Sequence, residues 1–143
     1  MAGAGKTLIL IAHEQKLPEL IKLMRKQRHV FEAYRLLATQ ETGEAIEREL
    51  GLEVTHLFSG RKGGEIQLCG LVCTNTVRAV YFIRDPVNPA FDEPDITPYY
   101  RACDLNNVPL ASNMVSAVAL THWLGRKLRP GTLNADREET ACM

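Results

Sequence analysis

The sequence lacks the features that mark a nucleic-acid-binding, membrane or secreted protein. Its 17 Lys and Arg residues balance 17 Asp and Glu residues, so no excess of positive charge attracts nucleic acid or an anionic membrane. No apolar stretch approaches the roughly 20 residues that a bilayer-spanning helix needs. The N-terminal stretch MAGAGKTLILIAHE has neither a long apolar region nor a small-residue cleavage site, so we expect a cytoplasmic protein without a secretory signal.

The four cysteines, Cys69, Cys73, Cys103 and Cys142, lack the spacing of a metal site or a disulfide framework. Cys69 and Cys73 stand four residues apart in a predicted helix, but no His or further Cys lies nearby in the sequence to complete a metal site. We therefore expect free thiols in a reducing compartment, no bound metal and no cofactor.

The N-terminal AGAGKT does not predict a nucleotide site. The nucleotide-binding pattern GxxxxGK[ST] needs a glycine five residues before Gly5, where the chain has none. The stretch also precedes the first predicted strand, whereas a phosphate-binding loop of this kind follows a strand.

The sequence does contain five short apolar runs of strand length, at residues 7–12, 35–38, 54–58, 79–83 and 108–112. Helical patterns alternate with them at residues 17–27, 42–51, 64–74, 96–106 and 115–128. The runs are apolar throughout, which is typical of strands that are buried on both faces of a parallel sheet. We expect a single three-layer α/β/α domain over residues 1–143, with residues 1–6 and about 129–143 flexible.

A parallel sheet of this kind binds ligands beyond the carboxyl ends of its strands. That rule predicts one site built from the loops at residues 13–16, 39–43, 59–65, 85–95 and 112–115. These loops are the polar, glycine-rich or acidic segments of the chain.

Two of these loops have the composition of a phosphate cradle. Thr39 and Thr42 supply hydroxyl groups where a helix begins, and helix N-terminal N–H groups bind phosphate. The stretch SGRKGGEIQ, residues 59–67, adds glycines that permit a close backbone approach, next to two cations. The alternatives are that Thr42 is only a helix N-cap and that the glycine-rich stretch is only a tight turn.

The remaining candidates are acids and a histidine. Asp85 follows a buried run directly, a position where a carboxylate tends to be held by hydrogen bonds. Carboxylates gathered near Glu65 could divide into a base and a protonated donor, ligate a divalent cation, or form a solvated acidic loop. His13 ends the first strand, where a lone histidine is more often a structural hydrogen-bonding group than a catalyst.

Taken together, the motifs resemble the methylglyoxal synthase family. IAHE follows the first predicted strand, ATxxTG the second, SGxxGGExQ the third and DPxNPxxxEPD the fourth, and PLASN precedes the last helix. The resemblance covers roughly residues 7–121. It implies a five-stranded parallel sheet with flavodoxin-like strand order, a homohexamer, and a metal-free lyase that converts dihydroxyacetone phosphate to methylglyoxal and inorganic phosphate.

The resemblance also assigns roles to residues of this chain. Glu65 matches the carboxylate that abstracts a proton from the substrate, and Asp95, Asp85 and Asp92 match its active-site neighbours. Substrate and phosphate binding fall to positions in the first three loops, including the start of the predicted helix at residues 64–74: His13, Glu14, Lys16, Thr39, Thr42, Ser59, Gly60, Gly63 and Gly64.

This chain departs from the family pattern at several of those positions. Glu65 and Glu14 replace aspartates, and Asp92 stands where the family has a histidine that polarises the substrate carbonyl. Glu41 lies in the second loop, near the expected phosphate. The C-terminal arginine of the family has no clear counterpart, although Arg126, Lys127 or Arg129 could approach the site. Changed geometry around a catalytic base can reduce or redirect activity.

Two further functions fit the same resemblance. Similar domains form the regulatory end of carbamoyl phosphate synthetase, where a phosphate pocket only senses an effector. The same fold also occurs in the bifunctional purine enzyme that closes the inosinate ring, as a cyclohydrolase. A pure sensor has no need of the retained acids, which favours the lyase.

Overall fold

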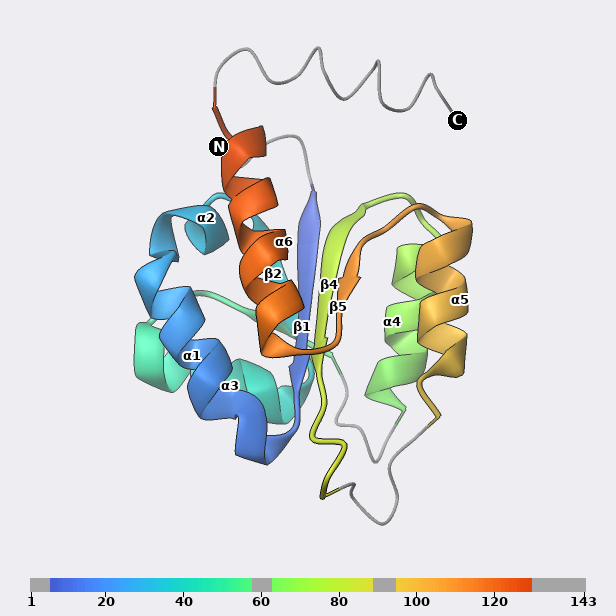
Figure 1. The fold of residues 1–143 in the computed structure, drawn as a ribbon, viewed down its shortest axis with the longest axis horizontal. Coiled ribbons are helices and arrows are strands. Elements are labelled where there is room, and N and C mark those ends of the chain that lie inside the picture. The colour runs from blue at the N-terminus through green and yellow to red at the C-terminus, as the bar shows by residue number, and fades with distance from the viewer. Residues whose placement is uncertain (1–5, 58–62, 89–94, 130–143) are drawn as a thin grey trace.

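The computed structural model describes residues 6–57, 63–88 and 95–129, and for Glu65 it describes the backbone alone. These residues form three layers, with a parallel sheet between two layers of helices (Figure 1). The expected α/β/α architecture is confirmed. No helix within the described ranges is long and apolar enough to cross a membrane.

The sheet has five strands: β1 (Thr7–Ala12), β2 (Arg35–Ala38), β3 (Thr55–His56), β4 (Val77–Ile83) and β5 (Leu110–Ala111). Every neighbouring pair is parallel, and the two long strands, β1 and β4, pair over their whole length in the centre. The five apolar runs therefore became strands as expected, although β3 and β5 are shorter than the runs that predicted them.

The strand order is β3-β2-β1-β4-β5, so the expected flavodoxin-like order is wrong in this detail. That order would insert β3 between β1 and β4. The centre of the sheet is covered by helices on both faces, and a strand there must be buried throughout. Thr55 and His56 of β3 are both exposed, so β3 lies at the edge.

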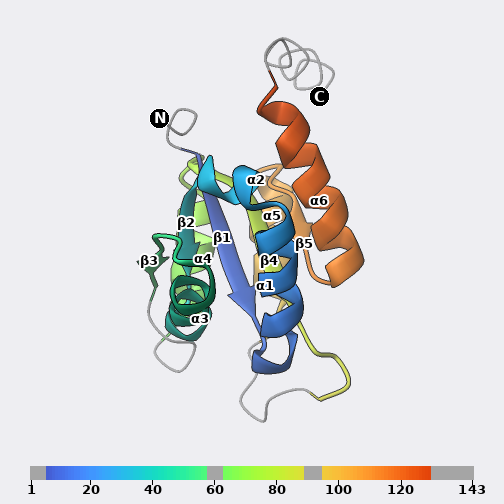
Figure 2. The ribbon, with the colours of Figure 1, turned by 90° about the vertical axis from the view of Figure 1, so that its left-hand side faces the viewer.

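Alternation along the strands divides the core into two clusters, because successive side chains point to opposite faces. Leu8 and Leu10 face a cluster shared with α1 (Leu17–Lys26), α2 (Arg28–Glu32), α3 (Gln40–Leu50) and α6 (Met114–Lys127). Ile9 and Ile11 face a cluster shared with α4 (Gly64–Val72) and α5 (Thr97–Leu105). Figure 2 shows α1 and α6 side by side over the first of these faces.

The helix ends follow local chemistry, with one correction. Gly51 stops α3 in the left-handed conformation at φ 65°, as predicted. Thr42 is not the N-cap of that helix: α3 begins earlier, with Thr39 at the cap position. The short helices η2 (Glu14–Lys16) and α2 were not predicted, because three to five residues are too few to show a helical period.

Candidate active site

The carboxyl ends of β1, β2 and β4 meet at one edge of the sheet, and the candidate residues follow them there. His13 comes directly after β1, Thr39 directly after β2, and Asp85 two residues after β4. The described candidates thus lie at three adjacent strand ends, in η2, and at or just before the starts of α3, α4 and α5. The predicted position of the site is a direct consequence of the parallel topology.

His13 and Asp85 join the first and fourth strand ends. The backbone N–H of Asp85 donates to Nδ1 of His13 at 2.8 Å, and the backbone N–H of His13 donates to the carbonyl of Ile83 at 2.9 Å. Because Nδ1 accepts a hydrogen bond, the neutral ring carries its proton on Nε2. His13 therefore has a structural role in this site in addition to any contact with substrate.

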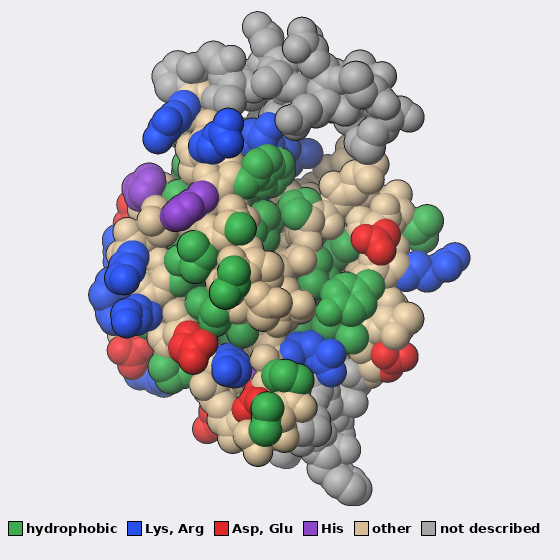
Figure 3. Space-filling view, viewed as in Figure 1, with side chains coloured by type: hydrophobic (Ala, Val, Ile, Leu, Met, Phe, Trp, Pro, Cys, Tyr) green, Lys and Arg blue, Asp and Glu red, His purple; other side chains and the backbone are tan. Residues whose placement is uncertain are grey.

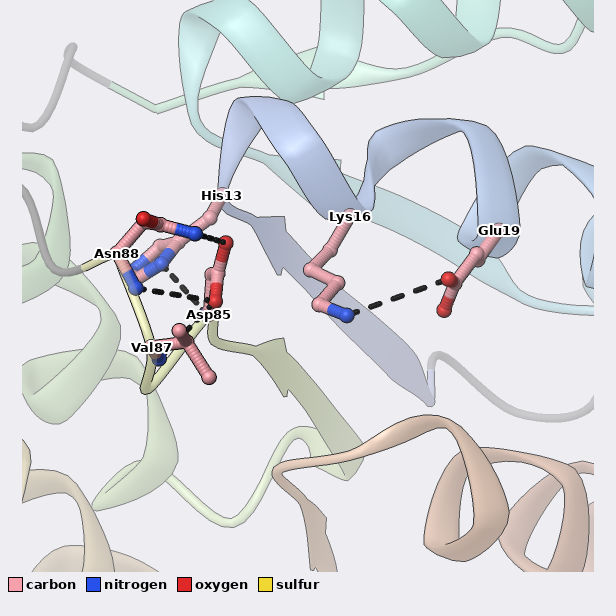
Figure 4. Close-up of polar contacts among 6 residues, drawn as sticks. All are labelled: His13, Lys16, Glu19, Asp85, Val87 and Asn88. Atoms are coloured by element: carbon pink, nitrogen blue, oxygen red, sulfur yellow. Dashed lines mark hydrogen bonds and ion pairs between the residues drawn. The ribbon is translucent and has the colours of Figure 1, made fainter.

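The Asp85 carboxylate is buried, with 7% of the residue exposed, and is enclosed by donors (Figure 4). Oδ1 accepts from the backbone N–H groups of Val87 at 3.1 Å and Asn88 at 3.2 Å, and Oδ2 accepts from Nδ2 of Asn88 at 3.3 Å. Burial favours the neutral acid, but these hydrogen bonds outweigh it and hold the pKa of Asp85 below its ordinary value. Asp85 is therefore a charged acceptor at neutral pH.

The charge of Lys16 also acts on the pKa of this carboxylate. Its ammonium lies 4.0 Å from Oε1 of Glu19, a half-exposed pair one helical turn apart, and it further lowers the pKa of Asp85 (Figure 4). Glu14, in the same 3-10 turn, is exposed. Of Glu14 and Lys16, Lys16 is the residue whose charge acts on Asp85.

The two threonines of the second loop are buried and engaged with β1. Thr42 is fully buried, and its hydroxyl accepts from the backbone N–H of Ala12 at 3.2 Å and donates to the Ala12 carbonyl at 3.5 Å. The Thr39 hydroxyl lies 3.3 Å from that of Thr42, which can accept from it. Thr42 thus ties the first turn of α3 to the end of β1.

The glycines before α4 shape the start of that helix. Gly63 is its N-cap residue, at φ 85°, a conformation that side chains other than glycine adopt rarely. Gly64 is the first helical residue and is buried, without a positive φ. The backbone of Glu65 is therefore in the first turn of α4, where helix N–H groups favour anions.

Asp95 prepares the start of α5. Its Oδ1 accepts from the backbone N–H of Thr97 at 3.0 Å and from the Thr97 hydroxyl at 2.8 Å. These bonds, followed by the charge of Arg84, hold the pKa of Asp95 below its ordinary value although partial burial opposes them. Asp85 and Asp95 are therefore both ionised at neutral pH, so neither is the protonated donor that the sequence left open as an alternative.

Several predicted positions lie outside the described residues: Ser59, Gly60, Asp92 and the side chain of Glu65. Three basic candidates are placed elsewhere, because α6 runs back from the carboxyl end of β5 to the opposite end of the sheet (Figure 1). Arg126 and Lys127 end this helix and Arg129 follows it, so they do not approach the site within one chain. Figure 3 shows Lys and Arg side chains at that end of α6, with hydrophobic side chains across the middle of this face and acidic and basic groups mainly around its edges.

The described cysteines are free thiols between α4 and α5, as expected for Cys69, Cys73 and Cys103. Burial raises the pKa of the Cys103 thiol to about 12, so it stays protonated. Within the described ranges, no three His, Cys, Asp or Glu side chains are grouped so that they could hold a metal ion.

Asn88 was missed as a site residue. A signal for it exists in the sequence, because Asp and Asn side chains commonly bond to backbone N–H groups two or three residues onward. In DPVN the acid and the amide stand three residues apart after a buried strand, so this turn could have been predicted from the motif.

No family model matches the chain. Individual proteins do. The chain is 40% identical over 119 residues to methylglyoxal synthase of Thermus thermophilus, which covers 83% of this chain and 94% of that protein. It is 40% identical over 120 residues to methylglyoxal synthase of Cupriavidus taiwanensis, over 84% of this chain and 90% of the relative.

The structure agrees with these sequence matches. It is similar to the crystal structure of methylglyoxal synthase from Elizabethkingia anophelis, with a TM-score of 0.76 and 31% identity. The match covers 81% of this chain and 76% of that one. The likeness therefore extends over most of this chain.

Proposed function

Because the chain belongs to the methylglyoxal synthase family, we propose that it is a lyase that converts dihydroxyacetone phosphate to methylglyoxal and inorganic phosphate. The observation that carries this proposal is the extent of the match, since 40% identity extends over 94% of a named synthase. The relatives reported above all carry the synthase name, so nothing favours the regulatory alternative.

In the proposed reaction Glu65 is the general base. Its carboxylate removes a proton from the hydroxymethyl carbon of the substrate, and the electron pair left behind forms an enediolate. The carbon–oxygen bond to phosphate then breaks, inorganic phosphate leaves, and the remaining enol tautomerises to methylglyoxal. A positioned base of this kind contributes about 10²- to 10⁴-fold to a rate.

The described part of the site supports this chemistry by its charges. The starts of α3 and α4 present helix N-termini, and Lys16 adds a cation, so an anion is favoured at these strand ends. We propose that phosphate binds there, with Thr39, His13, Lys16 and the residue 59–64 loop as its partners. Thr42 contributes indirectly, since its hydroxyl is engaged with Ala12.

Asp85 and Asp95 have different proposed roles. Asp85 is enclosed and charged, so it accepts hydrogen bonds from substrate or from neighbouring groups and does not shuttle the abstracted proton. Asp95 is exposed and held by Thr97, at the start of α5. In the substrate complex we assign it to proton exchange with the base, which requires it to leave Thr97.

The departures from the family pattern bear on the rate. Glu65 is one methylene longer than aspartate, and Asp92 cannot donate a hydrogen bond to the substrate carbonyl while it is ionised. A small displacement of reacting groups can cost about 10²-fold. We therefore propose a synthase whose activity is reduced, or whose substrate is a related triose phosphate ester.

The family resemblance also supports an assembly and a compartment. We propose a cytoplasmic homohexamer whose partners are small phosphorylated metabolites and inorganic phosphate. Light scattering coupled to gel filtration tests the assembly, because a hexamer of 16.0 kDa chains elutes far from a monomer.

The experiment for the lyase is an incubation of purified protein with dihydroxyacetone phosphate, in which phosphate and methylglyoxal are measured together. The proposal expects both products to appear in equal amounts, at a rate proportional to enzyme concentration. Phosphate release without methylglyoxal would indicate a phosphatase. No release at high enzyme concentration would reject the lyase.

A further inference from the structure

Asn88 contacts both oxygens of the Asp85 carboxylate. Its backbone N–H donates to Oδ1 at 3.2 Å and its side-chain Nδ2 donates to Oδ2 at 3.3 Å. Val87 supplies a backbone N–H to Oδ1 at 3.1 Å, and its side chain is 82% exposed. Within the described ranges, Asn88 is thus the residue whose side chain donates a hydrogen bond to this carboxylate.

The backbone of Asp85 is held independently of this contact. Its N–H donates to Nδ1 of His13 at 2.8 Å, and the preceding residue, Arg84, donates its N–H to the Ser112 carbonyl at 3.4 Å. The main chain is therefore anchored to the ends of β1 and β5. With the main chain anchored, the Asp85 side chain could still rotate. The backbone bonds to Oδ1 and the Asn88 amide bond to Oδ2 together oppose that rotation (Figure 4).

We propose that Asn88 is a positioning residue for the lyase reaction, which fixes the direction of the Asp85 carboxylate and keeps that group charged while substrate is bound. The effect of Asn88 on the lyase reaction rests on the proposed function, whereas its effect on the Asp85 carboxylate does not. An ionised carboxylate accepts hydrogen bonds and donates none. The direction that Asn88 gives to the Asp85 carboxylate therefore determines which hydrogen-bond donor, on the substrate or in the site, Asp85 can hold in place.

Other titratable or charged groups lie around Asp85, and substitution of Asn88 leaves these residues in place. His13 approaches from the end of β1, and Lys16, paired with Glu19, approaches from η2. Arg84, the residue before Asp85, lowers the pKa of Asp95 by its charge. A change that follows substitution of Asn88 is therefore a change in hydrogen bonding to Asp85.

The kinetic test compares pH profiles of kcat and kcat/KM for wild type, Asn88→Ala, Asn88→Asp and Asn88→Ser. We expect the acid limb of Asn88→Ala to move to higher pH, with about a tenfold loss of kcat on the acid side, the factor that one hydrogen bond to a charged group is worth. On the alkaline side, where the carboxylate stays charged but is less well directed, we expect a smaller loss of kcat that does not vary with pH. Asn88→Asp should move the limb further because two carboxylates then face each other, and Asn88→Ser should restore part of the loss.

Asn106→Ala is the matched control, since its Nδ2 donates to the Ala102 carbonyl at 2.8 Å, far from the site at the end of α5. It should lose stability and keep the wild-type pH profile. The same fractional loss at every pH in Asn88→Ala and Asn88→Ser would show a merely structural role and overturn the proposal.

A carboxyl-carbon NMR titration of Asp85 decides the matter without any activity measurement. We expect the pKa of Asp85 to rise in Asn88→Ala and to return part of the way in Asn88→Ser, with folding checked by circular dichroism. An unchanged titration in either folded variant would overturn the proposal. If the wild type releases no phosphate, the proposed function fails while this titration still tests Asn88.

Discussion

Asp85 donates its backbone N–H to Nδ1 of His13 across 2.8 Å, so two residues 72 positions apart in the chain share one hydrogen bond at the edge of the sheet. The contact joins the loop after β1 to the loop after β4. Both loops carry candidate site residues, and the bond fixes their relative position. It also fixes the tautomer of His13, whose neutral ring is protonated on Nε2.

The acceptor on His13 should matter for stability. His13→Ala leaves the N–H of Asp85 without its partner, and an unsatisfied buried donor costs about 1–3 kcal/mol of unfolding free energy. His13→Asn places a carbonyl oxygen near the position of Nδ1 and should lose less. Urea denaturation of both variants measures the difference. Equal losses would mean that the Asp85 contact adds nothing to stability.

Thr42 should act on stability more than on phosphate binding. Thr42→Val removes the hydroxyl that accepts from the buried N–H of Ala12, and we expect a loss of about 1–3 kcal/mol in unfolding free energy. Thr42→Ser keeps the hydroxyl and should lose less. The affinity for inorganic phosphate, measured by calorimetry, should fall more in Thr39→Val than in Thr42→Val. The reverse order would place Thr42 in direct contact with phosphate.

Gly63 should be required for the geometry of the α4 start. At φ 85° an alanine is strained, and Gly63→Ala should cost about 1–2 kcal/mol of stability. Because Glu65 follows two residues later, kcat should fall as well. Gly51→Ala, at φ 65° after α3, is a matched control that carries similar strain far from the site. A fall in kcat of equal size in both variants would separate Gly63 from catalysis.

The lowered pKa values of Asp85 and Asp95 predict a loss of stability in acid. The folded-state pKa values of Asp85 and Asp95 are lowered, so the native state binds fewer protons than the unfolded chain. Their contribution is therefore complete above the ordinary carboxyl pKa of about 3.9 and is lost as the pH falls through the lowered values. The urea midpoint of the wild type should fall over this window.

Asp85→Asn and Asp95→Asn each remove one such group, so the urea midpoint of each variant should fall less steeply than that of the wild type between about pH 5 and pH 3. Midpoints measured at several pH values test this directly. If the urea midpoints of both variants fall as steeply with pH as that of the wild type, neither pKa is lowered in solution.

Pattern alone predicted the layers of this fold and the edge of the sheet at which the candidate residues lie. TLILIA and AVYFI are apolar throughout, and they became the central strands β1 and β4. Strand order did not follow from pattern, because an apolar run records burial and not its neighbours. The exposure of Thr55 and His56 is the feature that indicates an edge position for β3.

The side-chain contacts were less predictable than the positions. Thr42 was expected as a cap or a phosphate ligand. It is not the cap, and its hydroxyl bonds to Ala12 of β1, which is 30 residues away in the chain. Such a contact depends on the packing of α3 against the sheet, and sequence spacing does not report it. Asn88 differs, since its bonds to Asp85 are local and follow from turn chemistry.

The most direct test of the lyase compares the release of phosphate and methylglyoxal from dihydroxyacetone phosphate by wild type and Glu65→Gln. The account predicts equal amounts of both products from the wild type and a loss of about 10²- to 10⁴-fold in the variant, the contribution of a general base. Phosphate affinity should stay the same or increase in the variant, since a negative charge is removed. Undiminished turnover by Glu65→Gln, or no turnover by the wild type, would contradict the account.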